Sequence, residues 1–132
     1  MTPGSVFLYK DFVFPDGIKK PKLLLALAPC TDGRVLCVLT TSQQHQHPLR
    51  DGCHSDAKEP VFTFNAHLGG FEKTTWIILQ PKLMTEKGLK NRFESGDCKS
   101  IIELCDTDLK AVINCLKKIE DISPYQLSLL PK

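Results

Sequence analysis

Five short apolar runs, each followed by turn residues or a polar segment, restrict the fold of this chain more than any other feature. They occupy residues 5–14, 22–28, 34–41, 61–66 and 74–79. Their β-branched, aromatic and leucine residues are typical of strands. No helical segment separates consecutive runs, as a parallel sheet would require. The pattern therefore predicts a mainly β fold with some α, built on a small antiparallel barrel or sandwich.

The last third of the chain changes to a helical period. The apolar residues that recur at this spacing are Leu109, Val112, Ile113, Leu116 and Ile119. Asp106 and Thr107 precede them as candidate caps. With 132 residues the chain has the length of one domain. We predict a β-barrel over about 4–85 and a helical carboxyl-terminal segment over about 86–125, whose amphipathic helix packs on the barrel, and then a short tail.

Composition and segment lengths predict a chain that does not enter a membrane. The sequence is 42% hydrophobic, and its longest apolar run spans residues 23–28, whereas a membrane helix needs roughly 18 residues. The first twelve residues lack the basic, apolar and small-residue regions of a secretory signal. We therefore expect a cytoplasmic location.

Six cysteines are present, an even number that in a secreted domain would suggest disulfides. They are Cys30, Cys37, Cys53, Cys98, Cys105 and Cys115. Because the cytosol keeps thiols reduced, we expect all six to be free. Cys37 and Cys115 belong to apolar faces and are predicted to be inaccessible.

The longest segment without predicted structure spans residues 42–60. It contains His45, His47 and His54, with Cys53 beside the last of these. These side chains are possible zinc ligands, but no paired Cys-x-x-Cys motif accompanies them. The alternatives are a solvated loop and a loop that contacts RNA, and our prediction includes no metal.

Basic residues cluster locally although the net charge is only +2. The clusters span residues 19–22 and 87–92. Such a distribution favours a polyanion held in a groove over one bound across a whole face. Three hydroxyl side chains, Thr40, Thr41 and Ser42, follow the third apolar run, where backbone capping alone would also account for them.

Four motifs in this order resemble the toxins of the PemK/MazF family: PGSVFLYKDFVFPDG, KKPKLLLAL, RVLCVLTTS and GGFEKTTWIIL. The likeness covers about the first 80 residues, and residues 108–123 resemble the carboxyl-terminal helix of a divergent branch. The resemblance implies an SH3-like barrel, a homodimer, and metal-independent cleavage of single-stranded RNA without a cofactor. It also implies silencing by an antitoxin protein whose peptide occupies the RNA groove.

The resemblance also suggests catalytic residues. The family's catalytic arginine directly precedes a proline, a position held here by Lys20, and a shift of two places brings Lys22 there instead. Its catalytic threonine matches Thr40, with Thr41 beside it. Lysine is a point charge and lacks the planar fork with which arginine grips two phosphate oxygens.

The remaining candidates are RNA-binding residues around the same strand ends: Lys19, Ser42, His45, His47 and His67. The histidines are also candidate general acids or bases. The blander interpretation of each is a solvated loop side chain, and Trp76 is expected in the core. The alternative function is a non-catalytic module that binds RNA or protein on the same barrel.

Overall fold

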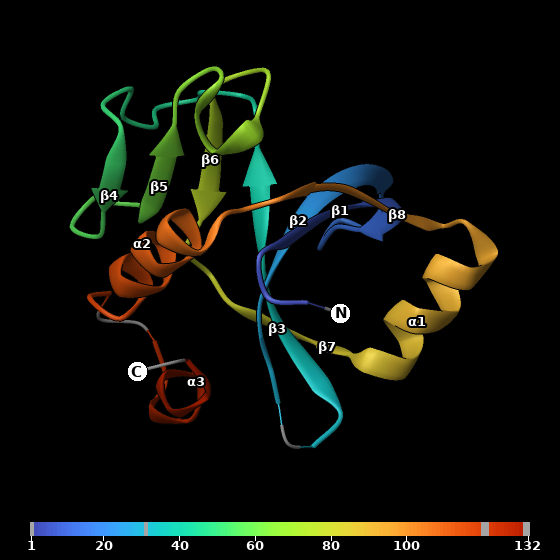
Figure 1. Ribbon diagram of the computed structural model, residues 1–132. Coiled ribbons are helices and arrows are strands. Elements are labelled where there is room, and N and C mark those ends of the chain that lie inside the picture. The colour runs from blue at the N-terminus through green and yellow to red at the C-terminus, as the bar shows by residue number, and fades with distance from the viewer. Residues whose placement is uncertain (1, 31, 120–121, 131–132) are drawn as a thin grey trace.

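The computed structural model describes residues 2–30, 32–119 and 122–130 (Figure 1). Its strands are β1 (Ser5–Val13), β2 (Lys19–Pro29), β3 (Arg34–Thr41), β4 (Gly52–His54), β5 (Val61–Phe64), β6 (Thr75–Ile78), β7 (Lys82–Thr85) and β8 (Cys98–Glu103). Its helices are α1 (Glu86–Ser95), α2 (Asp106–Leu116), α3 (Pro124–Leu129) and the single 3₁₀ turn η1 (Leu68–Gly70). The mainly β prediction is confirmed.

All pairings between neighbouring strands are antiparallel, as predicted. The order across the sheet is β4-β5-β6-β3-β2-β1-β8, with β7 also paired to β3. β4 and β8 are thus the two end strands, and β3 is central. Because a central strand has hydrogen-bonding partners on both edges, most of its backbone N–H and C=O groups are paired. Such a strand can be buried, which suits the apolar sequence of β3.

The central strands are buried on both faces, which explains why β2 contains an uninterrupted apolar run. Successive side chains of a strand point to opposite faces. Leu25 and Leu27 pack in the larger core with α2, whereas Leu24 and Ala26 pack in a second, smaller cluster with Leu89 of α1. A strand covered on only one face would alternate apolar and polar residues instead.

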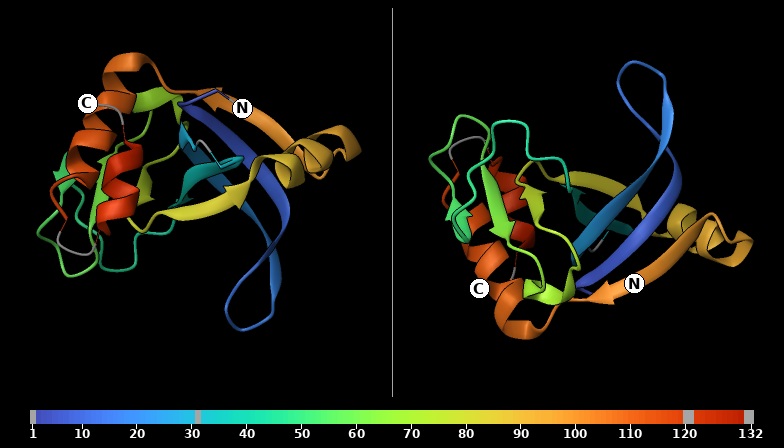
Figure 2. Two further views of the ribbon diagram at one scale, coloured as in Figure 1. Left: turned by 90° about the horizontal axis from the view of Figure 1, so that it is seen from below. Right: turned by 90° about the horizontal axis from the view of Figure 1, so that it is seen from above.

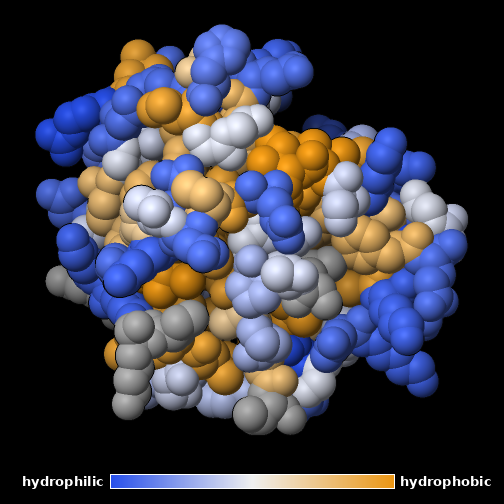
Figure 3. All heavy atoms as spheres, in the orientation of Figure 1, coloured by the Kyte–Doolittle hydropathy of each residue, from blue (hydrophilic) through white to orange (hydrophobic). Residues whose placement is uncertain are grey.

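The two longer helices lie on opposite sides of this sheet (Figure 1). On α1, Phe93 packs against Phe7 of β1 with ring centroids 5.5 Å apart, and the outer side of this helix is hydrophilic (Figure 3). On α2, Val112, Ile113 and Leu116 are buried in the larger core, so the predicted amphipathic packing is confirmed. Among the described residues, no helix is long and apolar enough to cross a bilayer.

The predicted caps of α2 are wrong. Cys105 occupies the N-cap position and makes no side-chain cap, so the helix begins one residue earlier than a cap at Asp106 would imply and two earlier than a cap at Thr107. Asp106 and Asp108 lie in the first turn instead. There their carboxylates interact favourably with the positive end of the helix dipole, which compensates for the missing cap.

β6 and β7 behave as one strand interrupted by a bend, and only its first half was predicted. β6 pairs with the end of β3 and β7 pairs with its beginning. Between them Gln80 donates its N–H to the carbonyl of Ile78 at 2.8 Å, and Pro81 has no N–H to donate to a ladder. The bend lets one chain segment pair with both ends of β3 along the same edge.

The carboxyl-terminal third is less helical than predicted. β8 returns to the sheet and pairs with β1, so the β structure extends past residue 85. The expected tail contains α3, which begins with a capping box formed by Ser123 and Gln126. Both differences arise because short elements are stabilised here by a sheet edge or a cap and carry no long periodic pattern.

Candidate functional site

β2 and β3 separate near the end of β3, where only the opposite edge of β3 continues to pair, with β6. Their last pair is Leu24 with Leu39, after which Thr40 and Thr41 pair with Ile77 and Trp76 of β6. β2 meanwhile continues beside β1, and the end of this β1–β2 hairpin stands clear of the body (Figure 2). The divergence leaves a pocket of about 690 Å³ between the hairpin and the end of β3. We call it the strand-end pocket.

The strand-end pocket gathers six of the predicted site residues. They are Lys20, Lys22, Thr40, Thr41, Ser42 and His45. Apolar side chains, among them Leu8, Phe14 and Ile18, contribute to the same lining. Phe14 is a lining residue that the sequence analysis did not include among the site candidates. Its position next to the Pro15-Asp16-Gly17 turn was the available signal that it lies at the hairpin end.

Three predicted residues do not line this pocket: Lys19, His47 and His67. Lys19 is exposed at the first position of β2, opposite Val13 of β1 near the end of the hairpin. His67 is exposed in the left-handed conformation, with φ 74°, and caps η1. Its backbone N–H donates to the carbonyl of Phe71 at 2.7 Å. This geometry is that of a turn residue.

Thr40 has a structural contact that its sequence context did not reveal. Its side chain is only 3% exposed, and its hydroxyl donates to the carbonyl of Leu23 at 3.1 Å. Because strand side chains alternate, Thr40 lies on the face of Leu36 and Val38. The hydroxyl therefore joins β3 to β2 just beyond their last backbone pair.

Thr41 presents its hydroxyl differently. It lies on the same face of β3 as Leu39, whose partner Leu24 shares a face of β2 with Lys22. Thr41 is half-buried, and its oxygen accepts the N–H of Gln43 at 3.1 Å. The hydroxyl proton is thus available to a ligand in the strand-end pocket.

Lys22 has the most perturbed charge in this pocket. Burial lowers the pKa of its amine below the ordinary value for lysine. None of the ion pairs between described residues includes it. A partly desolvated cation without a carboxylate partner favours the binding of an anion.

The 42–60 segment is an ordered cover and not a structureless loop. The carbonyl of Pro48 accepts hydrogen bonds from the indole of Trp76 at 2.8 Å and from the hydroxyl of Thr63 at 3.0 Å. Asn65 donates its side-chain amide to the carbonyl of Leu49 at 2.8 Å. These bonds hold the stretch around Pro48 and Leu49 against the sheet on the side of Trp76 and Thr63. The core position predicted for Trp76 is confirmed at 3% exposure.

The histidines of this segment differ in setting. His45 is exposed and has a left-handed backbone, with φ 49°. His47 is buried beside Trp76, and its Nε2 lies 3.9 Å from a carboxylate oxygen of Glu59. His54 is also buried, and its Nε2 contacts the carbonyl of Arg50 at 2.6 Å. Within the described ranges, no three His, Cys, Asp or Glu side chains are grouped as metal ligands.

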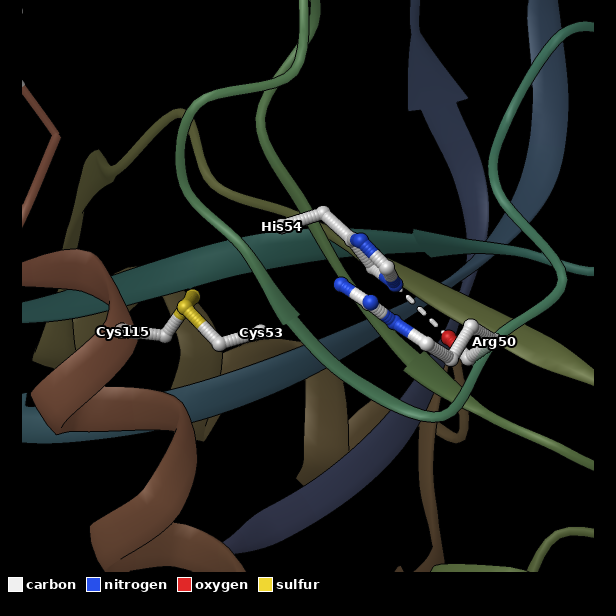
Figure 4. Close-up of a disulfide and its surroundings, with 4 residues drawn as sticks. All are labelled: Arg50, Cys53, His54 and Cys115. Atoms are coloured by element: carbon white, nitrogen blue, oxygen red, sulfur yellow. Dashed lines mark hydrogen bonds between the residues drawn. A yellow bond between two sulfur atoms is a disulfide. The ribbon is translucent and has the colours of Figure 1, made fainter.

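The prediction that all six thiols are free is wrong. Cys53 of β4 and Cys115 of α2 form a disulfide across a sequence separation of 62 residues (Figure 4). The packing of α2 against the β4 edge brings them together, a contact that no local pattern encodes. Cys37 is fully buried, as predicted. Burial raises its pKa to about 12, so its thiol is unreactive at neutral pH.

Comparison with known proteins identifies no relative. No protein-family model, curated protein sequence or solved structure matches this chain.

Proposed function

We propose that this protein binds single-stranded RNA in the strand-end pocket and cleaves its backbone without a metal ion. The observation that carries the proposal is that cations, hydroxyls and an imidazole line one pocket. The cations are Lys20 and Lys22, the hydroxyls are those of Thr41 and Ser42, and the imidazole is that of His45. Phosphate recognition uses cations and hydroxyl donors together. The resemblance to PemK/MazF toxins supports the same chemistry.

In this proposal the lysines stabilise the negative charge that develops on the phosphate. In the proposed reaction the 2′-hydroxyl attacks the adjacent phosphorus and negative charge grows on the non-bridging oxygens. Lys22 is partly desolvated, so its ammonium interacts with that charge more strongly than a solvated one does. Thr41 donates its hydroxyl proton to the same oxygens. Lys20, exposed on the hairpin, holds a neighbouring phosphate.

In this proposal His45 transfers the protons. The 2′-hydroxyl must lose a proton, and the departing 5′-oxygen must gain one. An imidazole at the pocket rim can accept the first proton and deliver it to the leaving oxygen. The products are a 2′,3′-cyclic phosphate and a 5′-hydroxyl. Thr40 acts as a positioning residue, because its bond to the Leu23 carbonyl holds the strand that carries Lys22.

The resemblance extends the proposal to fold and assembly. The curved antiparallel sheet would correspond to the SH3-like barrel of that family. Two copies would pair as a homodimer, and an antitoxin peptide would silence the enzyme by occupying the RNA groove. The enzyme would act as part of a type II toxin-antitoxin system. The Cys53–Cys115 disulfide argues against the cytoplasmic location expected from the sequence, because the cytosol keeps thiols reduced.

A non-catalytic RNA-binding module is the second candidate. Two observations favour it: lysine stands where the family has arginine, and the hydroxyl of Thr40 is committed to the Leu23 carbonyl. A module of this kind would retain the cationic pocket and bind RNA with a steep salt dependence. It would make no cyclic phosphate.

Alanine substitution of the pocket residues tests the enzyme. We expect Lys22→Ala and Thr41→Ala each to lower cleavage of a single-stranded RNA pool by at least ~10²-fold, the low end for an electrostatic or acid–base group. Cleavage should persist in EDTA because no metal is invoked. Matched controls are Lys99→Ala on β8 and Thr107→Ala on α2, both exposed residues outside the pocket. They should cleave at the wild-type rate.

The pH dependence of cleavage tests the charge on Lys22. Because burial lowers the pKa of this amine, activity that needs the ammonium should fall on the alkaline side at a lower pH than an ordinary lysine would give. Lys22→Arg should keep its activity to higher pH, since arginine stays charged. A loss of all activity in Lys22→Arg would instead identify Lys22 as a proton carrier.

A further pair of variants distinguishes the proposed roles of Thr40 and Thr41. Thr40→Val removes the bond to the Leu23 carbonyl and should lower the free energy of unfolding by about 1 kcal/mol. Thr41→Val should barely change stability but lower cleavage. If wild-type protein binds RNA and cleaves none of it, the enzyme proposal fails and the module replaces it.

A further inference from the structure

A second and larger hollow adjoins the strand-end pocket. Its volume is about 1600 Å³, more than an ordinary small-molecule site of roughly 300–1,000 Å³ provides. Its walls come from the 42–60 segment, from the bend between β6 and β7, and from the chain around α3. We call it the amide hollow, after three of its lining residues, Gln46, Gln80 and Gln126. Its size suits a stretch of polymer.

His45 connects the two sites. It is a lining residue of both the strand-end pocket and the amide hollow. Its left-handed backbone is an uncommon conformation for a residue other than glycine and is found preferentially at functional sites. A strand whose phosphate lies beside Lys22 therefore reaches the amide hollow by passing His45.

The charges of the two sites differ. The strand-end pocket has two lysines and a single carboxylate, that of Asp16. In the amide hollow, Lys58 and Lys118 are balanced by Asp56 and Glu59. A phosphate backbone is attracted to the first site and not to the second. The second site is thus better suited to the uncharged edges of bases.

The chemistry of the amide hollow agrees with base recognition. Glutamine side chains offer both a donor and an acceptor, which pair with base edges. The oxygen of Gln126 already accepts the N–H of Ser123 at 3.3 Å, which occupies one of its two lone pairs and leaves both N–H donors of the amide for a base. Gln80 is exposed at the β6–β7 bend, and none of the hydrogen bonds given for the described residues uses its side chain.

We propose that the amide hollow holds the bases on one side of the cleaved bond, and that Gln80 and Gln126 determine which base is accepted there. The inference rests on the proposed function, because it places the scissile phosphate in the strand-end pocket. Specific RNA recognition commonly targets unstacked bases through their hydrogen-bonding edges. The sequence preference of the enzyme would therefore reside in the segment between β6 and α3 and not in the catalytic lysines.

The test compares Gln80→Ala with wild type on two kinds of substrate. On a random RNA pool, wild type should show a base preference at one position beside the cut, and Gln80→Ala should reduce it about 5- to 100-fold, the range of one good amide–base contact. On a substrate with an abasic ribose at that position, which offers no base to the amide hollow, the two proteins should cleave equally. Asn91→Ala, which removes an exposed amide on α1, is the matched control and should keep the preference.

Binding provides a readout that does not need catalysis. Oligonucleotides with 2′-O-methyl groups cannot undergo attack by the 2′-oxygen, so their affinities report recognition alone. We expect the base preference to appear in these affinities and to be lost in Gln80→Ala. Normal cleavage with an unchanged preference in Gln80→Ala would overturn the inference and leave the proposed function intact. Absence of cleavage together with a Gln80-dependent binding preference would overturn the enzyme and retain the recognition site.

Discussion

Two segments border the strand-end pocket, and the one with regular structure is the less firmly held. The end of the β1–β2 hairpin is built from strands, yet Val13 and Ile18 are 56% and 49% exposed. The 42–60 segment contains only the short strand β4, yet buried hydrogen bonds and a disulfide hold it. Local stability follows buried contacts and cross-links more closely than it follows secondary structure.

The difference suggests how the pocket works. The 42–60 segment provides His45 from a wall with a fixed position, while the hairpin provides Lys20 from an arm that contacts solvent on several sides. Catalytic geometry benefits from a rigid support on at least one side of the reacting group.

The largest expected effect concerns the disulfide that anchors the 42–60 segment. Replacing both Cys53 and Cys115 with alanine should lower the free energy of unfolding by about 4 kcal/mol, the chain-entropy value for a loop of this length. Chemical denaturation under non-reducing conditions measures the change. Cys105→Ala, which removes an exposed free thiol, is the control and should stay within about 0.5 kcal/mol of wild type.

Thiol titration provides an independent check of that cross-link. Unfolded and unreduced protein should show the four free cysteines Cys30, Cys37, Cys98 and Cys105. A count near six, together with equal stability in oxidising and reducing buffer, would show that the 42–60 segment is held by hydrogen bonds alone. The contrast with the hairpin would then be smaller than we infer.

A smaller effect is expected from the hydrogen bonds to Pro48. Trp76→Phe and Thr63→Val each remove one donor to this carbonyl and should each cost about 1 kcal/mol. The double variant should cost more than the sum, because the carbonyl then loses both donors. Ser100→Ala on β8, an exposed hydroxyl, is the control. Strict additivity would mean that water replaces the lost donors and that the segment is less well packed.

The smallest effect is expected at the hairpin end. Ile18→Thr should change the free energy of unfolding by less than about 0.5 kcal/mol, as is usual for an exposed residue. In native-state hydrogen exchange, the amide of Phe14, which donates to the Ile18 carbonyl at 3.0 Å, should exchange much faster than that of Asn65, bonded to Asp51 at 2.9 Å. Slow exchange of Phe14, or a loss of stability that depends on protein concentration, would indicate that a second copy covers the hairpin.

Much of the architecture was predictable because strand and helix periods are local properties. The run 34–41 is β3 without a shift in its limits, and the helical spacing from Leu109 to Leu116 corresponds to α2. The elements that were missed, β4, β7, β8 and α3, are three to six residues long. Segments of this length form through contacts with a sheet edge or a neighbouring helix, and such contacts leave no periodic signal.

The candidate site, like the fold, was predictable only in part from the sequence. The sequence by itself determined which chemistry is present, since lysines before and after Pro21 and three successive hydroxyls can be recognised without a structure. Only the tertiary structure decided their settings: the end of the β2–β3 pairing at Leu24 and Leu39 opens the pocket, and the packing buries Thr40 and leaves Thr41 accessible. The same packing joins Cys53 to Cys115. Side-chain identity is local, whereas burial and proximity depend on residues far apart in the chain.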